Sequence, residues 1–284
     1  MPRGFLLVLV MTGCFSAREQ RDALLFEDSS AGGGQAGAAG GGHSGGGSST
    51  CPATDGTSWV ARPLYVLASP IPDPTGVACA GDDLWLVNGG HNGQTHRLVR
   101  YNTVDGGISF DHTYTGLIET GGTGVYGLTT EGNSVWLSVS GNRNKLVEVD
   151  VATGATGRVI GSPSFLGPSD LETDGQSLIV STGNGEVYRV TLDPVPRTSR
   201  LFKTWNIHDR DIGVAALGPE WLVAGLFGVL HTYSANGDFG GQVTLPGGAP
   251  FERALVGALC VQQNQLIMLG TAGIGVYELC NPRP

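Results

Sequence analysis

Charged side chains and long apolar runs are both scarce in this chain. Only 14% of its 284 residues are charged, and its net charge is -9 at pH 7. Phosphate backbones repel an acidic surface, so nucleic acid is not an expected partner. No run of eighteen apolar residues occurs, so no ordinary membrane-spanning helix is expected. The 40% of hydrophobic residues is nevertheless enough for a sizeable core.

Motifs of well-known enzyme classes are also missing. The chain has no Gly-x-Ser-x-Gly, no phosphate-binding loop and no His-Glu-x-x-His. His91 and His96 lack a cysteine or carboxylate at metal-ligand spacing, which argues against zinc. We therefore expect no cofactor, with calcium the one ion left open.

The first fourteen residues have the order of a secretory signal. Arg3 precedes a short apolar stretch, residues 5–11, and Thr12-Gly13-Cys14 follows. This end resembles the lipobox of bacterial lipoproteins, with Met11 where leucine is commoner. The resemblance implies removal of residues 1–13, acylation of Cys14 (palmitate among the acyl chains) and anchoring in the bacterial cell envelope, on the outer membrane. The alternative is an ordinary signal peptide with an incidental cysteine.

Residues 14–50 contain the lipidated cysteine and a glycine-rich tether. Three Gly-Gly-Gly runs are padded with alanine and serine, and no hydrophobic period survives. Such a composition cannot offset its ordering entropy, so a disordered spacer is expected. Its end-to-end distance would be roughly 30–35 Å. The folded domain is then expected over residues 51–284.

An apolar triplet recurs through that domain at steps of 43–51 residues. The five copies are Leu84-Trp85-Leu86, Val135-Trp136-Leu137, Leu178-Ile179-Val180, Trp221-Leu222-Val223 and Leu266-Ile267-Met268. Eight or nine residues before each triplet stand Gly76, Gly127, Asp170, Gly213 and Gly257. Turn residues separate the two, and a third alternating strand follows each triplet. Four short strands every ~40–45 residues are typical of propeller blades.

The fold class predicted is therefore all-β, a five-bladed β-propeller; a β-sandwich is the competing arrangement. The repeats resemble the broad group of Gly-Leu…Leu-Trp-Leu propellers in secreted bacterial proteins. The fifth repeat lacks an outer strand, and the unassigned segment 59–67 can complete it and close the ring. Closure would bring Cys51 near Cys280 and Cys79 near Cys260, which predicts these two disulfides. The alternative for Cys79 and Cys260 is two buried, unbonded thiols.

The loops that enter the inner strands, and those that join second to third strands, are expected on one face, called the loop face below. Asp170 replaces the glycine of the other repeats, which would put a carboxylate near the axis; the alternative is a turn cap. The same loops supply the other ligand-binding candidates. These are His91, Asn142, Asn184, His208 and Asp211.

Two functions follow from these features. The first is a monomeric, surface-anchored propeller that binds a protein or a small molecule at the loop face, attached to the membrane through Cys14. The second is an enzyme, because Thr75-Gly76-Val77, Gly93-Gln94 and Thr173-Asp174-Gly175 resemble parts of plant and bacterial-type glutaminyl cyclases. Val87-Asn88 and Tyr126-Gly127 stand where that family usually has acidic residues, so no catalytic residue is assigned. A calcium-dependent lactonase-like hydrolase is a further variant, with Asp170, Asp211, Asn142 and Asn184 as ligands.

Overall fold

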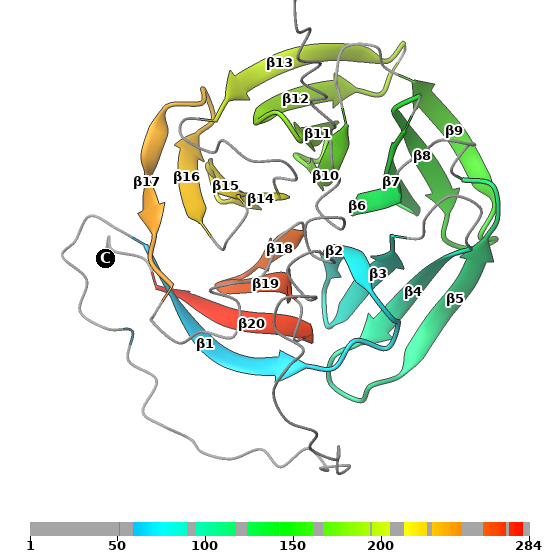
Figure 1. Cartoon of the computed structure of the whole chain (residues 1–284), viewed down its shortest axis with the longest axis horizontal. Helices are drawn as coiled ribbons and strands as arrows, with labels where there is room; N and C mark the ends of the chain where they lie inside the picture. Colours follow the sequence, from blue (N-terminus) through cyan, green and yellow to red (C-terminus); the bar gives the residue numbers. More distant parts are fainter. Residues whose placement is uncertain are drawn as a thin grey trace, which may run out of the picture. The chain divides into compact units, whose positions relative to one another are not determined.

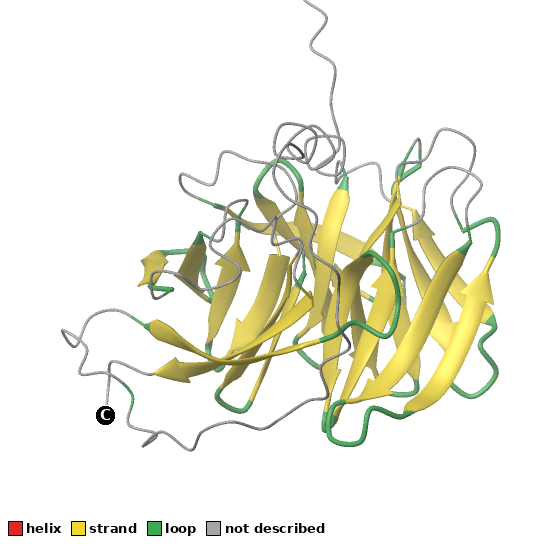
Figure 2. Cartoon of the chain, turned by 60° about the horizontal axis from the view of Figure 1, so that its bottom comes forward, coloured by secondary structure: helices red, strands yellow, loops and turns green. Residues whose placement is uncertain are grey.

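A computed structural model describes residue 51 and residues 59–89, 95–117, 124–141, 143–161, 167–193, 195–204, 213–225, 229–245, 258–270 and 273–280. All of them belong to one compact unit, 44–284. They form strands and connecting turns without a helix (Figure 2), so the described part contains no helix long and apolar enough to cross a membrane.

Five four-stranded antiparallel sheets are arranged around a central axis (Figure 1), which confirms the five-bladed propeller. Blade 1 contains β2 (Pro74–Ala80), β3 (Asp83–Asn88), β4 (His96–Asn102) and β5 (Ile108–Tyr114); blade 2 contains β6 (Gly124–Glu131), β7 (Ser134–Ser140), β8 (Lys145–Asp150) and β9 (Thr156–Gly161); blade 3 contains β10 (Pro168–Thr173), β11 (Ser177–Thr182), β12 (Glu186–Thr191) and β13 (Arg197–Lys203); blade 4 contains β14 (Gly213–Leu217), β15 (Glu220–Ala224), β16 (Leu230–Ser234) and β17 (Phe239–Val243); blade 5 contains β18 (Leu259–Gln262), β19 (Gln265–Gly270), β20 (Gly273–Cys280) and β1 (Val60–Leu67).

A tight hairpin joins the first two strands of every blade. In blades 1 to 4 its glycine has a positive φ, for example 66° at Gly81 and 80° at Gly175, with open space around the position of a Cβ. In blade 5 Gln263 takes a φ of 54° instead. These turns need the left-handed region that glycine enters without strain. They define the hairpin face, the end of the propeller opposite the loop face.

The N-terminal strand closes the ring as predicted. β1 pairs antiparallel with β20, from Val60 opposite Cys280 to Leu67 opposite Ile274, and so supplies the outer strand of blade 5. Cys51 is bonded to Cys280, with their Cα atoms 5.6 Å apart. Since the first folded strand completes the last blade, no blade is left without an outer strand.

The second predicted disulfide joins the inner strands of blades 1 and 5. The Cα atoms of Cys79 and Cys260 are 5.7 Å apart. The two cysteines are not at equivalent positions: Cys79 pairs with Leu84, the first residue of its triplet, whereas Cys260 pairs with Ile267, the second. In the sequence each cysteine stands three residues after a glycine, Gly76 or Gly257, but this equal spacing does not carry over into the pairing of the strands.

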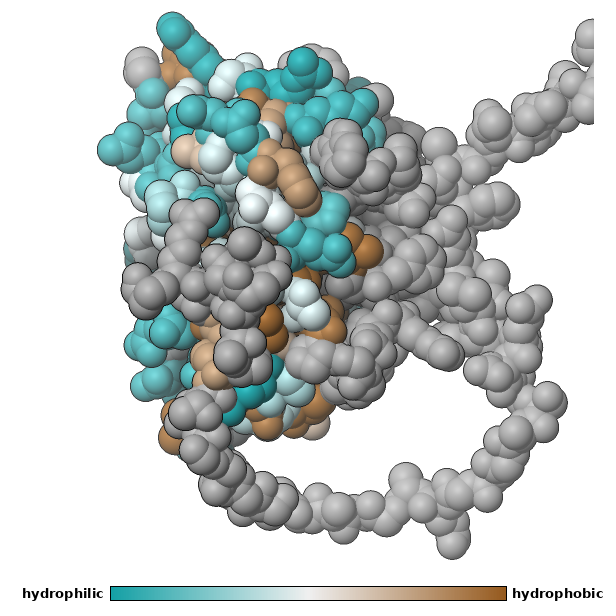
Figure 3. All heavy atoms as spheres, turned by 90° about the vertical axis from the view of Figure 1, so that its left-hand side faces the viewer, coloured by the Kyte–Doolittle hydropathy of each residue, from teal (hydrophilic) through white to brown (hydrophobic). Residues whose placement is uncertain are grey.

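Each pair of neighbouring blades encloses its own hydrophobic core. Trp136 and Leu178, for instance, belong to the cluster between blades 2 and 3, and Trp136 is fully buried. Trp85 and Trp221 lie in other inter-blade clusters, so all three strand-centre tryptophans pack blades together. On the side of the molecule that Figure 3 shows, the coloured residues are mainly hydrophilic, with scattered hydrophobic ones among them. The propeller is thus stabilised by five separate cores around one axis.

Candidate functional site on the propeller axis

One position on each inner strand lies against the inner strand of the next blade. The five axial positions are Gly76, Gly127, Asp170, Gly213 and Ala258, as the pairing with the second strands shows. A Cβ on Gly127 would lie 2.3 Å from the Cα of Asp170, and one on Gly213 would lie 2.1 Å from Cδ2 of Leu259. Glycine is needed where the strands approach this closely, because a side chain would collide with the following blade. In the fifth blade Ala258 takes the place that the sequence pattern gave to Gly257.

Asp170 is the one axial residue with a longer side chain. It is 0% exposed, and the Val214 N–H of blade 4 donates to its Oδ2 at 3.0 Å. Its Oδ1 is buried and has no well-formed hydrogen bond within the described part of the chain. Burial raises the pKa of this carboxyl well above its usual range, although the backbone N–H groups of Val214, Leu171 and Leu259 act in the opposite direction. Asp170 lies within β10 and therefore does not cap a turn.

Glu172, two residues further along β10, projects from the same side of the strand as Asp170. Its Oε1 accepts a 3.4 Å bond from the Thr129 hydroxyl and a 2.8 Å bond from the Thr173 N–H, and its Oε2 accepts a 3.3 Å bond from the Ala216 N–H. Burial is the main reason that the pKa of Glu172 is raised. The sequence analysis missed this residue. The available signal was its spacing of two from Asp170 on a predicted strand.

Both acidic side chains reach from blade 3 to blade 4 in a regular way. Asp170 bonds to Val214 and Glu172 to Ala216, so alternate residues of β10 accept N–H groups from alternate residues of β14. The inner edge of β14 has no partner strand within its own sheet. The two carboxyl groups therefore satisfy backbone donors that would otherwise face the axis.

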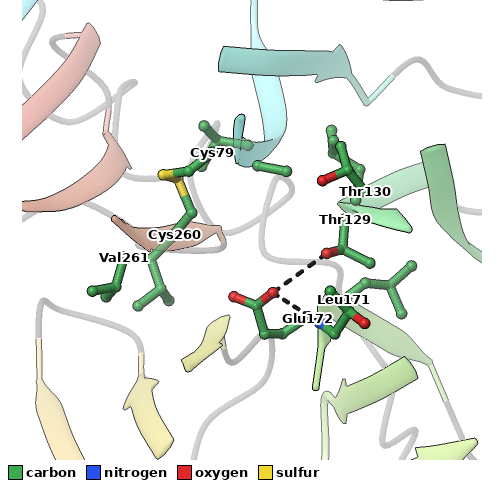
Figure 4. Close-up of a pocket in the computed structure, with 12 residues that line it drawn as sticks. Cys79, Thr129, Thr130, Leu171, Glu172, Cys260 and Val261 are labelled. Atoms are coloured by element: carbon green, nitrogen blue, oxygen red, sulfur yellow. Dashed lines mark hydrogen bonds between the residues drawn. A yellow bond between two sulfur atoms is a disulfide. The ribbon is translucent and has the colours of Figure 1, made fainter. Parts of the chain in front are cut away.

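A cavity of about 110 Å³ lies beside Glu172 (Figure 4). Its lining residues are Val77, Ala78, Cys79, Leu128, Thr129, Thr130, Leu171, Glu172, Thr173, Leu259, Cys260 and Val261. The described lining contains no lysine, arginine or histidine, so Glu172 has no cationic neighbour there. Exposure along the inner strands increases toward the hairpin face, from 0% at Asp170 and Ala258 to half-buried Glu131 and Gln262. The cavity therefore lies on the hairpin side of the buried axial positions.

Of the other predicted ligand residues, the structure describes only Asn184. Asn184 lies in an exposed turn of blade 3 and donates a 3.0 Å hydrogen bond from Nδ2 to Glu186, so local contacts account for it. His91, Asn142, His208 and Asp211 lie outside the described residues. Whether Asp170 and Asp211 converge thus stays a prediction.

The described residues contain one group with metal-like spacing, Cys51, Glu278 and Cys280. Both cysteines form the disulfide described above, and Glu278 is paired with Arg62. A thiol in a disulfide is not a thiolate ligand, so this group is not a metal site. Calcium at the axis stays a prediction.

The comparisons with known proteins agree with the fold. No protein-family model matches the chain, and no curated protein sequence gives a significant match. A glutaminyl cyclase from Myxococcus xanthus has a similar structure, with a TM-score of 0.57 and 12% identity over 79% of this chain and 97% of that one. A structure titled YjhT (TM-score 0.50, 8% identity, 75% of this chain and 95% of that one) and a luciferin-regenerating enzyme (0.51, 10%, 74% and 78%) are also similar. At these identities the likeness shows a shared propeller fold, and two of the three proteins named are enzymes.

Proposed function

We propose that this chain is a monomeric lipoprotein, held at the surface of a bacterial outer membrane through lipid on Cys14, whose propeller binds a small ligand or a protein at its loop face. Two kinds of observation support the proposal. The signal, the acylation motif and the glycine tether supply the anchor, and the closed ring supplies a rigid support for the loops. The address and the ligand are independent parts of the proposal.

The observation that carries the binding part is Asp170. Four blades occupy the axial position with glycine or alanine, and in blade 3 only Oδ2 of the carboxyl group has a structural partner, the Val214 N–H, which leaves Oδ1 for a ligand. Burying a carboxyl group with one unbonded oxygen costs free energy, and such groups concentrate at functional sites. Its complement is a cation or a strong hydrogen-bond donor. We therefore assign the ligand one of these groups, to be placed at the start of β10.

Thermal unfolding of the purified full chain tests this assignment. The probes are calcium chloride and methylammonium chloride, with sodium chloride at equal ionic strength as the reference. A probe present at about 100 times its Kd stabilises the protein by roughly 2.7 kcal/mol, which raises Tm by about 5–10 °C. Asp170→Asn should abolish the shift, and Asp150→Asn, at the end of β8 on the hairpin face, should keep it. No shift with either probe, or an equal shift in both variants, would contradict Asp170 as a ligand contact.

An enzyme is the second candidate, as a glutaminyl-cyclase-like or a calcium-dependent, lactonase-like protein. It is favoured by the direction of the pKa shifts of Asp170 and Glu172, since burial favours the protonated form of both carboxyl groups and a protonated acid can donate a proton in catalysis. Thr75, however, which lies in one of the stretches that resemble the cyclases, has a structural role. Its hydroxyl donates a 2.7 Å hydrogen bond to the Val125 carbonyl of the next blade.

Turnover decides between the two candidates. The full chain would be incubated with a peptide that begins with glutamine, with ammonia release measured, and with a simple lactone in the presence and absence of calcium. An enzyme should turn over one substrate, and Asp170→Asn or Glu172→Gln should lower kcat. Turnover that is undetectable, or unchanged in both variants, leaves the binding function as the better account.

A further inference from the structure

The cavity beside Glu172, called the axial cavity below, is enclosed by the inner strands of four blades. Three consecutive residues of β2, β6, β10 and β18 line it, and β14 of the remaining blade donates the Ala216 N–H to Glu172. Among the lining residues, Thr130, Glu172, Thr173 and Val261 are only half-buried. A small molecule therefore has access to the carboxyl group from the hairpin side.

The five inner strands carry acidic residues and no basic one. Their charged residues are Glu131, Asp170 and Glu172, whereas β2, β14 and β18 have none. A carboxylate that is surrounded by protein attracts a cation more strongly than one in water, because its surroundings screen charge less. The axial cavity therefore favours a positively charged ligand.

Glu172 has an acceptor position free for such a ligand. An ionised carboxylate offers about four acceptor positions. The donors that Glu172 has in the described part of the chain are the Thr129 hydroxyl and the N–H groups of Thr173 and Ala216, and all three are uncharged. Figure 4 shows the carboxyl group extending into the space between Thr129 and the disulfide that joins blades 1 and 5. The remaining position can accept an N–H group from an ammonium ion there.

The size and the walls of the axial cavity narrow the ligand further. A cavity of ~150 Å³ holds benzene, so one of about 110 Å³ suits a molecule of roughly four or five heavy atoms. Aliphatic residues of all four strands line it: Val77, Leu128, Leu171 and Leu259. Within the described residues, no three acidic, histidine or cysteine side chains converge on the cavity, so the several carboxylates that calcium prefers are missing.

We propose that the axial cavity binds a short primary alkylammonium ion, such as propylammonium, with its ammonium group on Glu172 and its hydrocarbon chain against the aliphatic lining. This site is separate from the one proposed at Asp170, which does not line the cavity. Because burial raises the pKa of Glu172, the ammonium group competes with a proton for the carboxylate. The other titratable groups on the inner strands are Asp170 and Glu131, since Cys79 and Cys260 are bonded to each other.

Calorimetric titration of the purified full chain tests the proposal. The probe is propylammonium chloride, with 1-propanol as the neutral molecule of the same size and sodium chloride at equal ionic strength as the reference. The affinity for propylammonium should rise up to about ten-fold per pH unit below the folded-state pKa of Glu172 and level off above it, because the ion displaces a proton in the lower range. Methylammonium, which lacks two methylene groups, should bind roughly fifteen-fold more weakly. 1-Propanol should bind weakly and without dependence on pH.

Variants locate the bound ion. Glu172→Gln keeps the size of the side chain and removes its charge, so it should weaken propylammonium binding roughly ten-fold to a hundred-fold. Asp105→Asn, in an exposed turn, is the matched acid-to-amide control and should leave binding unchanged. Asp170→Asn should keep propylammonium binding while it abolishes the shift assigned to Asp170, so the two proposed sites can fail separately.

The pH profile of the wild-type chain tests the site even if Glu172→Gln does not fold. Several results would overturn the proposal: no binding of propylammonium, equal binding of 1-propanol, binding of calcium chloride alone, or an unchanged affinity in folded Glu172→Gln. In each of these cases the axial cavity is not an alkylammonium site.

Discussion

Replacing Asp170 with asparagine should change how the stability of the propeller depends on pH. Asparagine has the shape of the protonated acid and can still accept the Val214 N–H, but it does not ionise. Burial raises the folded-state pKa of Asp170 above its ordinary value of 3.8, so the folded state holds this proton more tightly than the unfolded chain does. The stability that protonation contributes is thus fully present below about pH 3.8 and is lost as pH rises toward the folded-state pKa.

The variant does not undergo that loss. Between the two pKa values, the free energy of unfolding of Asp170→Asn should therefore gain on that of the wild type by about 1.4 kcal/mol per pH unit, and level off above the folded-state pKa. Any constant difference from the new amide group does not alter this slope. Urea unfolding followed by fluorescence of the buried tryptophans, at several pH values from about 4 to 8, measures it.

Asp150→Asn is the matched control of opposite sign. Hydrogen bonds from the Thr153 hydroxyl and N–H lower the pKa of Asp150, so its contribution is present above the unfolded-state pKa and lost as pH falls. Both pKa values of Asp150 lie at or below the ordinary value of 3.8, so this variant should lose ground to the wild type only as pH rises toward about 4, and its difference from the wild type should stay flat from about pH 4 to 8. A difference between Asp170→Asn and wild type that is flat, or that falls with rising pH, would refute the claim that Asp170 is buried as an acid with a raised pKa.

Three further predictions concern the architecture. Gly127→Ala should destabilise the fold by about 1–3 kcal/mol, because the new Cβ would collide with the backbone of the next blade. Gly161→Ala should not destabilise the fold, because the space around that position is open. Chemical denaturation would compare the two variants. Ala61→Glu buries an unpaired charge in the closing strand and should lower the free energy of unfolding by roughly 3–5 kcal/mol. Leu64→Glu, at a position that is 40% exposed, should change it by no more than about 0.5 kcal/mol. Equal effects of the two substitutions would mean that β1 does not close the ring. Removing both cysteines of the inner-strand disulfide should cost up to about 5 kcal/mol, since it joins residues 181 apart; an unchanged denaturation midpoint would show that it contributes nothing.

Much of the fold could be predicted because the features that define each repeat depend on residues close together in the sequence. An apolar triplet, a tight turn before it and an alternating strand after it are each a property of a few neighbouring residues. Counting such units gave five blades, and the missing outer strand of the fifth led to segment 59–67. The pairing of Cys51 with Cys280 followed from that closure. The same counting failed by one residue in blade 5, where Ala258 occupies the axial position, because the pattern cannot locate a strand's register from its glycine alone.

The candidate site was only partly predictable. Asp170 stood out because it breaks the repeat, and the structure does place it on the axis. Glu172 was missed because its importance comes from Ala216 and Thr129, which belong to two other blades. Contacts between residues more than forty positions apart cannot be found from the local pattern of the sequence.

By itself, the sequence determined the blade and the number of blades, because these depend on residue types that recur at short range, whereas the order of signal, tether and domain stays a prediction. Only the tertiary structure decided which inner strands lie within collision distance and which backbone donors the two carboxyl groups of β10 accept. Those facts arise when the ring closes, since closure brings residues more than two hundred positions apart into contact.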